Sequence, residues 1–402
     1  MLKKAEQKRL VRHSARHYRK ARGAPGKTPG MKRALLAIVL LALIIGGIYL
    51  RFGGGKPYPD LTLPTANMPV LEEVLAYPEP LGNVAVAGDG RVFFTVHPES
   101  RPAGNKLLVR ELDGRIHAFP SEAAQAELFD AVMGLVIDAR GTLWTIDHGQ
   151  HGLRQPRLLG FDTHTGKVVK DIAFKADVAP KGSFLQDLQV NSTGSMAYIA
   201  DASFVRNSPG IVVVDLKTSD AWRALEGDPS VMPQSWLIRT ATKDMSWLGG
   251  LFTLKPGLDG IAISKNDQML VFGAMAHDTL FSVPTAALTR AEAAQAALQV
   301  KALGRKPLND GLSMDRNDNI FITDVEHGSV MKMTPAGLLS TVVQDVQRLR
   351  WADALSFGPD GWLYVADSAI PDQMFRSKSH MRAQAPYRIF RFKPGTEGVP
   401  GQ

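Results

Sequence analysis

Residues 312–324 read LSMDRNDNIFITD, and residues 355–367 read LSFGPDGWLYVAD. Each stretch alternates apolar and polar residues, turns at a short run rich in Asp, Asn and Gly, and continues as an apolar strand that ends in Asp. Period-2 alternation with β-branched and aromatic residues on both sides of a turn is typical of an antiparallel hairpin. The pattern recurs in residues 84–97, 135–148, 188–201 and 261–274. We therefore expect six copies of one strand-turn-strand unit.

The spacing of the copies predicts an all-β fold, a six-bladed β-propeller. Successive copies begin 51, 53, 73, 51 and 43 residues apart, which fits one four-stranded blade per copy and an insertion in one blade. Each copy is expected to supply the two inner strands of its blade. Candidate strands at 68–76 and 386–394 lie at opposite ends of the predicted domain, 66–396. We expect them to share a blade and close the ring, which removes exposed sheet edges.

Several segments fall outside the repeats. Residues 225–256 form a long connection and 285–303 are expected to form an Ala-rich helix, both as loops over one face of the propeller. Residues 52–65 are rich in Gly and Pro, and they are predicted to be a linker that sets the propeller off from a membrane. Residues 397–402 are expected to be a C-terminal tail.

The N-terminal region predicts one transmembrane or signal-anchor helix over 34–51. Residues 34–50, ALLAIVLLALIIGGIYL, carry no charge and as a helix would span about 25 Å. The basic segment 1–33 precedes them and is expected to stay in the cytoplasm, which sends the propeller to the extracytoplasmic, periplasmic side. We expect an uncleaved anchor. Cleavage and secretion, or a true start at Met31, are alternatives.

The formal net charge of +8 does not indicate a nucleic-acid partner. Residues 1–33 hold 12 of the 47 Lys and Arg residues and one acid, so the rest of the chain has 35 basic and 38 acidic residues. A nucleic-acid role would need a basic face on the folded domain. The chain has no Cys, which excludes disulfides, thiolate metal ligands and a cysteine nucleophile.

Hairpin geometry predicts two rings of polar residues. The residues just before each copy and just after it share a rim, because the second strand of a hairpin returns to the face where the first began. An inner ring at the channel mouth is expected to contain Asn83, Gly134, Asp187, Asp259, Asn309, Asp310 and Asp353. An outer ring is expected to contain His97, Asp147, His148, Asp201, His277, Asp324, Glu326, His327 and Asp367.

Carboxylates around a narrow channel repel one another, so their pKa values rise unless a cation, a ligand ammonium group or shared protons compensate. The inner ring is therefore the candidate functional site. The outer-ring Asp residues are expected to accept backbone hydrogen bonds instead. The predicted ligand-binding residues are Asp259, Asp310, Asp353, Asn309, Asp187, Asn83, His148 and His327.

Four stretches resemble the major royal jelly protein and Yellow family, in its bacterial branch. They are GNVAVAGDGRVFFTVHP from Gly82, PGIVVVDLKTSDAWRALEGDPSVMP from Pro209, VPTAAL followed by NDGLSMDRNDNIFITDVEHG, and WADALSFGPDGWLYVADSAIP with the closing PYRIFRFKPG. The resemblance implies an exported six-bladed propeller. The family includes insect binders of small amines and sterols, and proteins called dopachrome-converting.

A more distant likeness links the chain to gluconolactonase and senescence-marker propellers. The likeness implies a central divalent metal, held by a Glu of the first blade and by Asn and Asp at the starts of later inner strands. Asp259 and Asp310 are similar to two of those positions, but the first blade offers Asn83 and no Glu. A calcium or zinc ion held by Asp259, Asp310 and Asn83 is the cofactor that this likeness suggests.

The favoured hypothesis is an exported, monomeric Yellow-like propeller that binds a small polar or aromatic molecule in its channel. One alternative is an enzyme, either for metal-assisted lactone hydrolysis or for a tautomerisation of the dopachrome type in which a rim His or Asp moves a proton. A second alternative is an envelope protein-interaction module, which would present an exposed apolar or aromatic patch.

Overall fold

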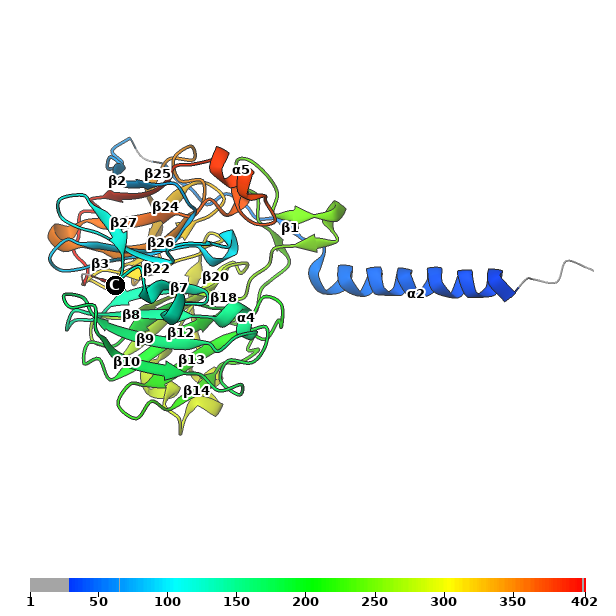
Figure 1. The fold of residues 1–402 in the computed structure, drawn as a ribbon, viewed down its shortest axis with the longest axis horizontal. Coiled ribbons are helices and arrows are strands. Elements are labelled where there is room, and N and C mark those ends of the chain that lie inside the picture. Colours follow the sequence, from blue (N-terminus) through cyan, green and yellow to red (C-terminus); the bar gives the residue numbers. More distant parts are fainter. Residues whose placement is uncertain (1–28, 65, 400) are drawn as a thin grey trace, which may run out of the picture.

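The computed structural model describes residues 29–64, 66–399 and 401–402. Most of the predicted basic segment 1–33 lies outside these residues. A helix, α2 (Pro29–Phe52), projects from the rest of the chain (Figure 1). Its span Lys32–Phe52 is long and apolar enough to cross a membrane, and it is exposed along its length. The helix expected over 34–51 is therefore confirmed.

The remainder is the predicted six-bladed propeller, with six four-stranded antiparallel sheets around one axis. The first three blades are β3 (Leu81–Val86), β4 (Val92–Val96), β5 (Leu107–Arg110) and β6 (Ile116–Ala118); β7 (Val132–Ile137), β8 (Thr142–Asp147), β9 (Arg157–Asp162) and β10 (Val168–Ala173); β11 (Leu185–Val190), β12 (Met196–Asp201), β13 (Gly210–Asp215) and β14 (Ala221–Ala224).

The last three blades follow the same strand order. They are β18 (Leu258–Ile263), β19 (Met269–Ala274), β20 (Thr279–Pro284) and β21 (Lys301–Arg305); β22 (Leu312–Met314), β23 (Ile320–Asp324), β24 (Ser329–Met333) and β25 (Leu339–Gln344); β26 (Ala352–Phe357), β27 (Leu363–Asp367), β28 (Tyr387–Phe392) and β2 (Glu72–Tyr77). Short helices in the connections are η1 (Pro98–Ser100), α3 (Ala124–Leu128), α4 (Gly149–Gly152), η5 (Pro359–Gly361), η6 (Ile370–Asp372) and α5 (Lys378–Ala383).

The hydrophobic core lies between neighbouring blades. Every residue of the innermost strands β3, β7, β18 and β26 is buried, because both faces of these strands are covered by adjacent blades. The outermost strand β10 is mostly exposed. The second strands β4, β23 and β27 are buried throughout as well, which explains why the second strand of each repeat is a nearly continuous apolar run instead of an alternating one.

The ring closes as predicted. Strand β2, near the start of the propeller, pairs with β28 at its end, so the sixth blade combines segments from both ends of the domain. Two cross-strand ion pairs, Glu72 with Arg391 and Glu73 with Arg388, lie on the exposed side of this pairing. Exposed pairs of this kind contribute little, so the buried apolar residues of β28 carry most of the closure.

The linker prediction was wrong in one respect, because this segment packs on the propeller instead of spacing it from α2. Strand β1 (Lys56–Pro57) pairs in parallel with β15 (Trp236–Leu237). Tyr58 is buried, and its hydroxyl donates to the carbonyl of Lys306 at 2.7 Å. The Gly and Pro content of the segment reflects turns against the domain rather than a free chain.

The long connection before β18 covers the channel. It contains β15, β16 (Ser246–Trp247), η2 (Leu248–Gly250) and β17 (Phe252–Thr253). Its residues Ile238, Met245 and Leu254 form one apolar cluster with Tyr58 and Trp351. We call this connection the cap, and we call the face that it covers the mouth face. The innermost strands begin on the mouth face.

The expectation of an Ala-rich helix over 285–303 was also wrong. The segment forms two 3₁₀ helices, η3 (Thr285–Leu288) and η4 (Ala293–Gln299), and its last residues enter β21. The fourth blade needs β21 as its outer strand, and that pairing overrides the helix propensity of Ala. The connection between β20 and β21 lies on the face opposite the cap, so the two insertions do not share a face.

The segment expected to be a C-terminal tail crosses the end of the channel opposite the cap. The Gly401 carbonyl accepts from Ile137 N at 3.0 Å, and the Gln402 carbonyl accepts from Phe357 N at 2.7 Å. The Gln402 amide donates to Val190 O at 3.2 Å. Because these three partners belong to β7, β26 and β11, the described tail residues cover the end of the channel opposite the cap.

Ring closure predicts a large stability cost for truncating β28. Ile389 is fully buried in β28, packed between blades. Ile389→Ala should lower the free energy of unfolding by about 2–5 kcal/mol, from lost burial and a residual cavity. Val169→Ala, at a position 56% exposed in β10, is the control and should change it by less than about 0.5 kcal/mol. Equal effects in urea unfolding would contradict the closure account.

Candidate functional site

The predicted inner ring forms inside the channel, because bulges turn its residues toward the axis. The register of the innermost strands shifts between Leu185 and Leu188, between Leu258 and Gly260, and between Ala352 and Leu355. The ring residues Asp187, Asp259 and Asp353 lie within these shifts. A bulge bends a strand and redirects a side chain, so the same irregularity in three blades directs carboxylates to one region.

Gly134 occupies the ring position of the second blade for a steric reason. A Cβ atom there would lie 2.1 Å from the carbonyl oxygen of Gln186 in the next blade. A Cβ atom at Gly311 would likewise lie 2.4 Å from the carbonyl oxygen of Asp353. Backbones of adjacent inner strands therefore approach closely at this level, and Asp occurs only at positions where a side chain fits.

Four carboxyl groups, which we call the acid cluster, share the channel: Asp187, Asp259, Asp310 and Asp353. Their residues are at most 5% exposed, apart from Asp187, which is somewhat more accessible. Burial, followed by repulsion from Asp310, raises the pKa of Asp187 to about 8. Burial also raises the pKa of Asp310 to about 6, although a hydrogen bond from Trp351 opposes the shift.

Asp259 and Asp353 have even less of their carboxylate charge offset by hydrogen-bond donors. Burial and repulsion by the other acids raise the pKa of both carboxyl groups well above the usual value for Asp. No described residue donates a hydrogen bond to either side-chain oxygen of Asp259, nor to Oδ2 of Asp353. Burying a carboxylate without a partner costs free energy. These two groups are therefore either protonated or available to bind a cation.

The remaining members of the cluster have defined partners. Asn83 Nδ2 donates to Asp187 Oδ1 at 2.7 Å, and Trp351 Nε1 donates to Asp310 Oδ2 at 2.7 Å. Lys306 is fully buried nearby, and its ammonium group donates to the carbonyls of Ala274 and His277. Lys306 also lowers the pKa of Asp259, but its effect is smaller than those of burial and of the other acids. The cluster therefore keeps its excess of acid over base.

A small cavity connects the acid cluster to the cap. Its volume is about 50 Å³, and we call it the mouth cavity. Its polar lining consists of His97, Glu99, Gln186 and Asp310. Its apolar lining consists of Phe184, Leu254, Pro256, Met275, Trp351, Ile370 and Met374. Two acids, Glu99 and Asp310, thus line a mostly apolar cavity, which suits a group that is positive and small.

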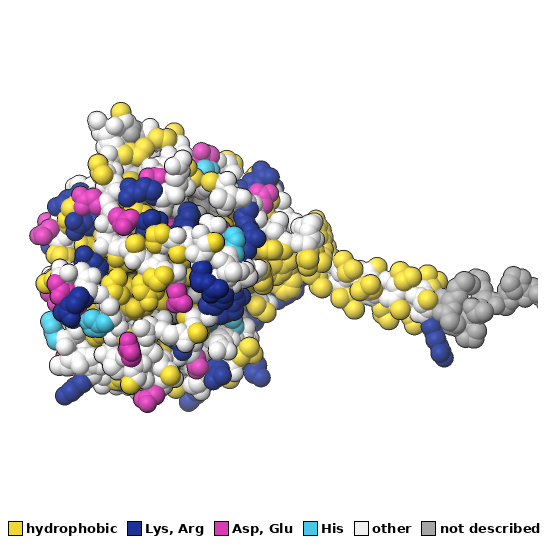
Figure 2. All heavy atoms as spheres, turned by 45° about the horizontal axis from the view of Figure 1, so that its top comes forward, with side chains coloured by type: hydrophobic (Ala, Val, Ile, Leu, Met, Phe, Trp, Pro, Cys, Tyr) yellow, Lys and Arg dark blue, Asp and Glu magenta, His cyan; other side chains and the backbone are white. Residues whose placement is uncertain are grey.

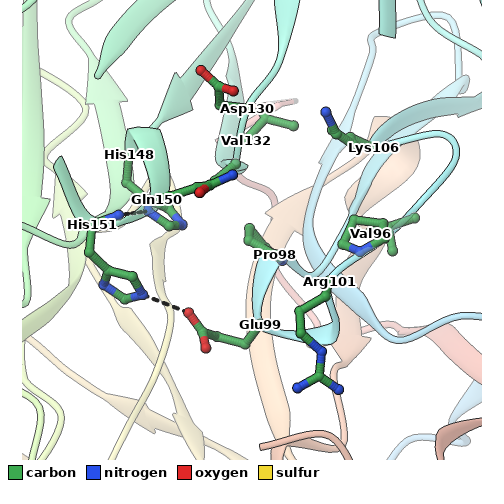
Figure 3. Close-up of a pocket in the computed structure, with 12 residues that line it drawn as sticks. Val96, Pro98, Glu99, Arg101, Lys106, Asp130, Val132, His148, Gln150 and His151 are labelled. Atoms are coloured by element: carbon green, nitrogen blue, oxygen red, sulfur yellow. Dashed lines mark hydrogen bonds and ion pairs between the residues drawn. The ribbon is translucent and has the colours of Figure 1, made fainter. Parts of the chain in front are cut away.

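A second group of titratable side chains lies beside the mouth cavity, in a pocket of about 380 Å³ between the first two blades (Figure 3). We call it the histidine pocket. Figure 3 shows His148 and His151 on one wall and Glu99 on the other. His151 Nε2 lies 2.7 Å from Glu99 Oε1. Glu99 lines both the pocket and the mouth cavity, so the two spaces adjoin.

A left-handed backbone turn positions His151. All four residues of α4 have positive φ, and two of them, Gln150 at 50° and His151 at 59°, are not Gly. Such residues cost free energy, and two in succession beside a pocket are a reason to infer a functional role. His148 precedes the turn and its Nδ1 accepts from His151 N at 2.9 Å. The ring of His148 is thereby fixed with Nε2 free of any described partner.

The titratable groups in and beside the histidine pocket differ in their charge near pH 7. Burial lowers the pKa of His148 to about 3 and that of His97 to about 4, so both are neutral near pH 7. Burial alone would raise the pKa of Glu99, but the hydrogen bond and charge of His151 outweigh it and lower the pKa to about 2. Glu99 is therefore an ionised carboxylate at the edge of the mouth cavity.

The predicted site residues thus divide between three places. Asn83, Asp187, Asp259, Asp310 and Asp353 come together in the channel. Asn309 is buried next to them, with its Nδ2 donating to the Asp310 carbonyl at 2.8 Å. The other two predicted ligand-binding residues, His148 and His327, lie outside the acid cluster.

His327 takes part in an ion-pair network at the rim. Its Nδ1 lies 3.0 Å from Asp324 and 3.7 Å from Asp60 of the linker. Burial alone would lower the pKa of His327, but the hydrogen bond and charge of Asp324 raise it to about 9. His327 therefore contacts the linker at the rim and takes no part in the acid cluster.

The outer-ring Asp residues make structural hydrogen bonds, as expected. Asp147 accepts from Asp130 N at 2.7 Å and from Ala131 N at 2.9 Å. Asp201 accepts from Phe184 N at 2.8 Å, and Asp367 accepts from Trp351 N at 2.9 Å. Each of these carboxylates fixes the chain that enters its own blade.

Three functional candidates were missed from the sequence: Glu99, His151 and Trp351. Glu99 follows His97 in a loop, and only folding brings it next to a residue 52 positions away. The sequence GQHG around His151 was the available signal, because paired glycines flanking polar residues favour positive φ. Trp351 directly precedes the sixth inner strand and donates to the acid cluster.

The distant likeness suggests a divalent cation held by Asp259, Asp310 and Asn83. Asn83 uses its amide on Asp187, while its Oδ1 accepts from Val84 N at 2.9 Å. Within the described ranges, no three or more His, Asp or Glu residues are grouped to hold a metal.

Comparisons with known proteins agree with the fold. The family model described as "Major royal jelly protein" matches residues 131–382, more than half of the chain. No curated protein matches the sequence significantly.

Three solved structures illustrate the likeness of fold. A luciferin-regenerating enzyme has 10% identity and a TM-score of 0.55, over 83% of this chain and 98% of its own. A gluconolactonase from Xanthomonas campestris has 12% identity and a TM-score of 0.51, over 84% and 98%. A calcium-binding regucalcin from Agrobacterium tumefaciens has 16% identity and a TM-score of 0.51, over 82% and 96%. At such identities these structures are similar in fold alone.

The acid cluster predicts a loss of stability as pH rises. A carboxyl group whose pKa is raised on folding stabilises the folded state fully below its unfolded pKa, near 4, and this contribution is lost as pH rises through the folded pKa. The values of about 6 for Asp310 and about 8 for Asp187 place this loss between pH 4 and 8. Asp187→Asn removes this carboxyl group, so it should stabilise the protein more at pH 8 than at pH 5. The difference in the free energy of unfolding should be at least about 1.4 kcal/mol.

Thermal and urea unfolding at pH 5 and pH 8 measure this difference. Asp113→Asn is the control, because Asp113 lies in an exposed turn and hydrogen bonds from Arg115 lower its pKa. Its effect should be the same at both pH values. An Asp187→Asn effect that is also independent of pH would show that folding does not raise the pKa of Asp187.

Proposed function

The chain belongs to the major royal jelly protein family, and we propose that its propeller binds a small molecule that joins an apolar or aromatic body to a cationic group. The observation that carries this proposal is the mouth cavity, where Glu99 and Asp310 lie among apolar side chains. An ammonium group placed between them would gain two charge-assisted hydrogen bonds in a partly desolvated site.

Charge explains why a cation is favoured over a neutral or anionic ligand. Burial, and after it repulsion within the acid cluster, raises the pKa values of Asp187, Asp259 and Asp353, and a positive charge at the mouth removes part of that repulsion. Trp351 and Phe184 also line the cavity, and the faces of aromatic rings attract cations. An anion in the mouth cavity would be repelled by the ionised Glu99 carboxylate.

Size decides how such a ligand would lie. The mouth cavity of about 50 Å³ accommodates an ammonium group but not an aromatic ring system. The adjoining histidine pocket of about 380 Å³ is large enough for a ring. Glu99 borders both spaces, so we propose that the cationic group lies between Glu99 and Asp310 while the body of the ligand occupies the histidine pocket.

We also propose that α2 anchors the propeller to the extracytoplasmic side of a membrane. The apolar span Lys32–Phe52 follows a segment rich in Lys and Arg, and such a segment remains on the cytoplasmic side. The propeller follows the other end of the helix. The ligand would therefore be one that occurs outside the cytoplasm.

Binding of an amine should depend on the two acids at the mouth. Asp310→Asn and Glu99→Gln should each weaken tryptamine binding about 10- to 100-fold, because each removes one charged hydrogen-bond partner worth about 1.5–3 kcal/mol. Isothermal titration calorimetry with the full chain in detergent measures the affinity. Tryptophol, which has a hydroxyl group in place of the amine, is the matched ligand and should bind weakly and equally to all three proteins.

The control variant is again Asp113→Asn, whose side chain lies on the opposite face. It should bind tryptamine like the parent. If Asp310→Asn and Glu99→Gln also bind tryptamine and dopamine as the parent does, or if tryptophol binds as tightly as tryptamine, the acidic anchors are not used.

The Glu99–His151 pair favours a second candidate function, transfer of a proton within a bound substrate. A carboxylate that orients an imidazole is the common arrangement of a general base. The strained turn of α4 places His151 in the histidine pocket. A tautomerisation of the dopachrome type needs one group to remove a proton from carbon and to deliver it elsewhere, and it needs no cofactor.

Turnover of dopachrome tests this second function. His151→Asn should lower kcat by at least about 100-fold, because Asn tolerates positive φ but has no titratable ring. Tryptamine affinity should change much less. A parent protein that converts dopachrome no faster than buffer does, or an Asn variant with full kcat, would leave binding without chemistry.

A further inference from the structure

The helix α2 joins the propeller on the mouth face. Arg51 Nη2 donates to the carbonyl of Arg206 at 2.8 Å, and Lys255 Nζ donates to the carbonyl of Gly53 at 2.7 Å. Gly54 N donates to Gly250 O of the cap at 3.0 Å. In Figure 1, α2 leaves the propeller beside β1 and the cap, on the side away from the C-terminus. The channel mouth and the end of the apolar helix therefore face the same way.

An aromatic cluster surrounds this junction. Phe252 of the cap lies with ring centroids 5.9 Å from Phe52 of α2, 5.6 Å from Phe204 and 5.9 Å from Phe375. Trp247 completes the cluster, at 5.1 Å from Phe375. Figure 2 shows hydrophobic atoms that continue from the helix onto the adjoining part of the propeller.

Two apolar side chains extend from this cluster into solvent. Leu248 is 81% exposed and Phe375 is 65% exposed. Both have positive φ, 53° for Leu248 and 57° for Phe375, a conformation that large side chains avoid. Phe375 keeps ring contacts with Trp247 and Phe252, but most of its surface and of that of Leu248 faces outward. Strained backbone that carries exposed apolar side chains is a reason to infer a partner for them.

Basic residues accompany the aromatic ones. Lys243 Nζ lies 4.7 Å from the ring centroid of Trp247, and Lys56 Nζ lies 4.6 Å from that of Trp236. Arg51 stacks over Phe52 at 5.3 Å. Aromatic rings with Lys and Arg beside them are the composition of the membrane–water interface, where the rings occupy the headgroup level and the cations contact lipid phosphates.

We propose that the mouth face docks on the bilayer that α2 spans, with Leu248, Phe375 and the Trp247–Phe252 hairpin in the headgroup region of the outer leaflet. The proposal rests on the anchoring role of α2 proposed above. The continuity of the aromatic cluster with Phe52 selects the bilayer as the partner, because the helix holds this face at the membrane surface. A ligand would then reach the mouth cavity from the interface of the leaflet.

Single-cysteine labelling tests the docking directly, because the chain has no Cys of its own. The full chain is reconstituted in liposomes of phosphatidylcholine and phosphatidylglycerol, and a nitroxide is attached at Leu248→Cys or Phe375→Cys. The matched controls are Leu112→Cys and Leu338→Cys, 67% and 69% exposed in turns of the opposite face. Leu41→Cys, in the middle of α2, reports whether the helix is in the bilayer.

Collision rates with oxygen, which concentrates in lipid, and with a water-soluble nickel complex give the depth of each label. We expect labels at 248 and 375 to favour oxygen over nickel several-fold relative to labels at 112 and 338. A label at 41 in lipid with labels at 248 and 375 in water would overturn the docking and leave the anchor intact.

A label at 41 in water would overturn both the anchor and the docking. Dipolar broadening between labels at 248, without contact with lipid, would place a second copy of the chain on this face and would also overturn the proposal. Folding of each variant is verified by its unfolding curve, and these substitutions are at exposed positions where a cysteine is tolerated.

Discussion

The pairing of β2 with β28 is the constraint on which the rest of the structure depends. It closes six blades into a ring, and closure fixes the innermost strands around one narrow axis. Adjacent inner strands come so close that Gly134 and Gly311 have no room for a Cβ atom. Any side chain that the bulges turn inward at this level must therefore face the others across the channel. Asp187, Asp259 and Asp353 are such side chains.

Closing the ring therefore carries an electrostatic free-energy cost at the centre of the channel. Carboxyl groups that are buried together raise each other's pKa, and the oxygens of Asp259 have no described donor. Interblade packing offsets this cost, since the core of the propeller lies between blades and not in the channel. A site that is destabilised in the folded protein and open toward an apolar cavity is suited to binding a positive group, because the ligand removes the repulsion.

Much of the fold followed from the sequence, because each blade repeats one local pattern. The hairpin of residues 355–367 already specifies alternation, turn and apolar strand, and its spacing from the other copies gives the number of blades. Ring closure followed because residues at both ends of the domain had strand character. The linker was harder to predict. Its Gly and Pro residues are typical of a free spacer, and only the tertiary contacts of Tyr58 show that it is packed.

The site was predictable where it depends on hairpin geometry and not where it depends on loops. Asp259, Asp310 and Asp353 were found because they precede repeats. The depth of these side chains in the channel was not predicted, because a β-bulge leaves no clear mark in the sequence. Glu99 and His151 meet only because α4 adopts a left-handed turn and the loop after β4 crosses to the second blade. The periodicity of the sequence predicts neither the left-handed turn nor the path of this loop.

The aromatic cluster on the mouth face also consists of residues that lie far apart in the sequence. Phe52, Phe204, Phe252 and Phe375 are distant in the chain, and each alone is an unremarkable apolar residue. Assembled around the end of α2, they form a surface that is continuous with the helix.

The most direct test of the central claim is the number of protons released when an amine binds at pH 7. Calorimetric titrations of tryptamine in buffers with different ionisation enthalpies give that number. The account predicts net release of a fraction of a proton or more, because a cation at the mouth favours the ionised acids and Asp187, with a pKa of about 8, is still largely protonated. Binding without any exchange of protons would contradict the coupling between the ligand and the acid cluster.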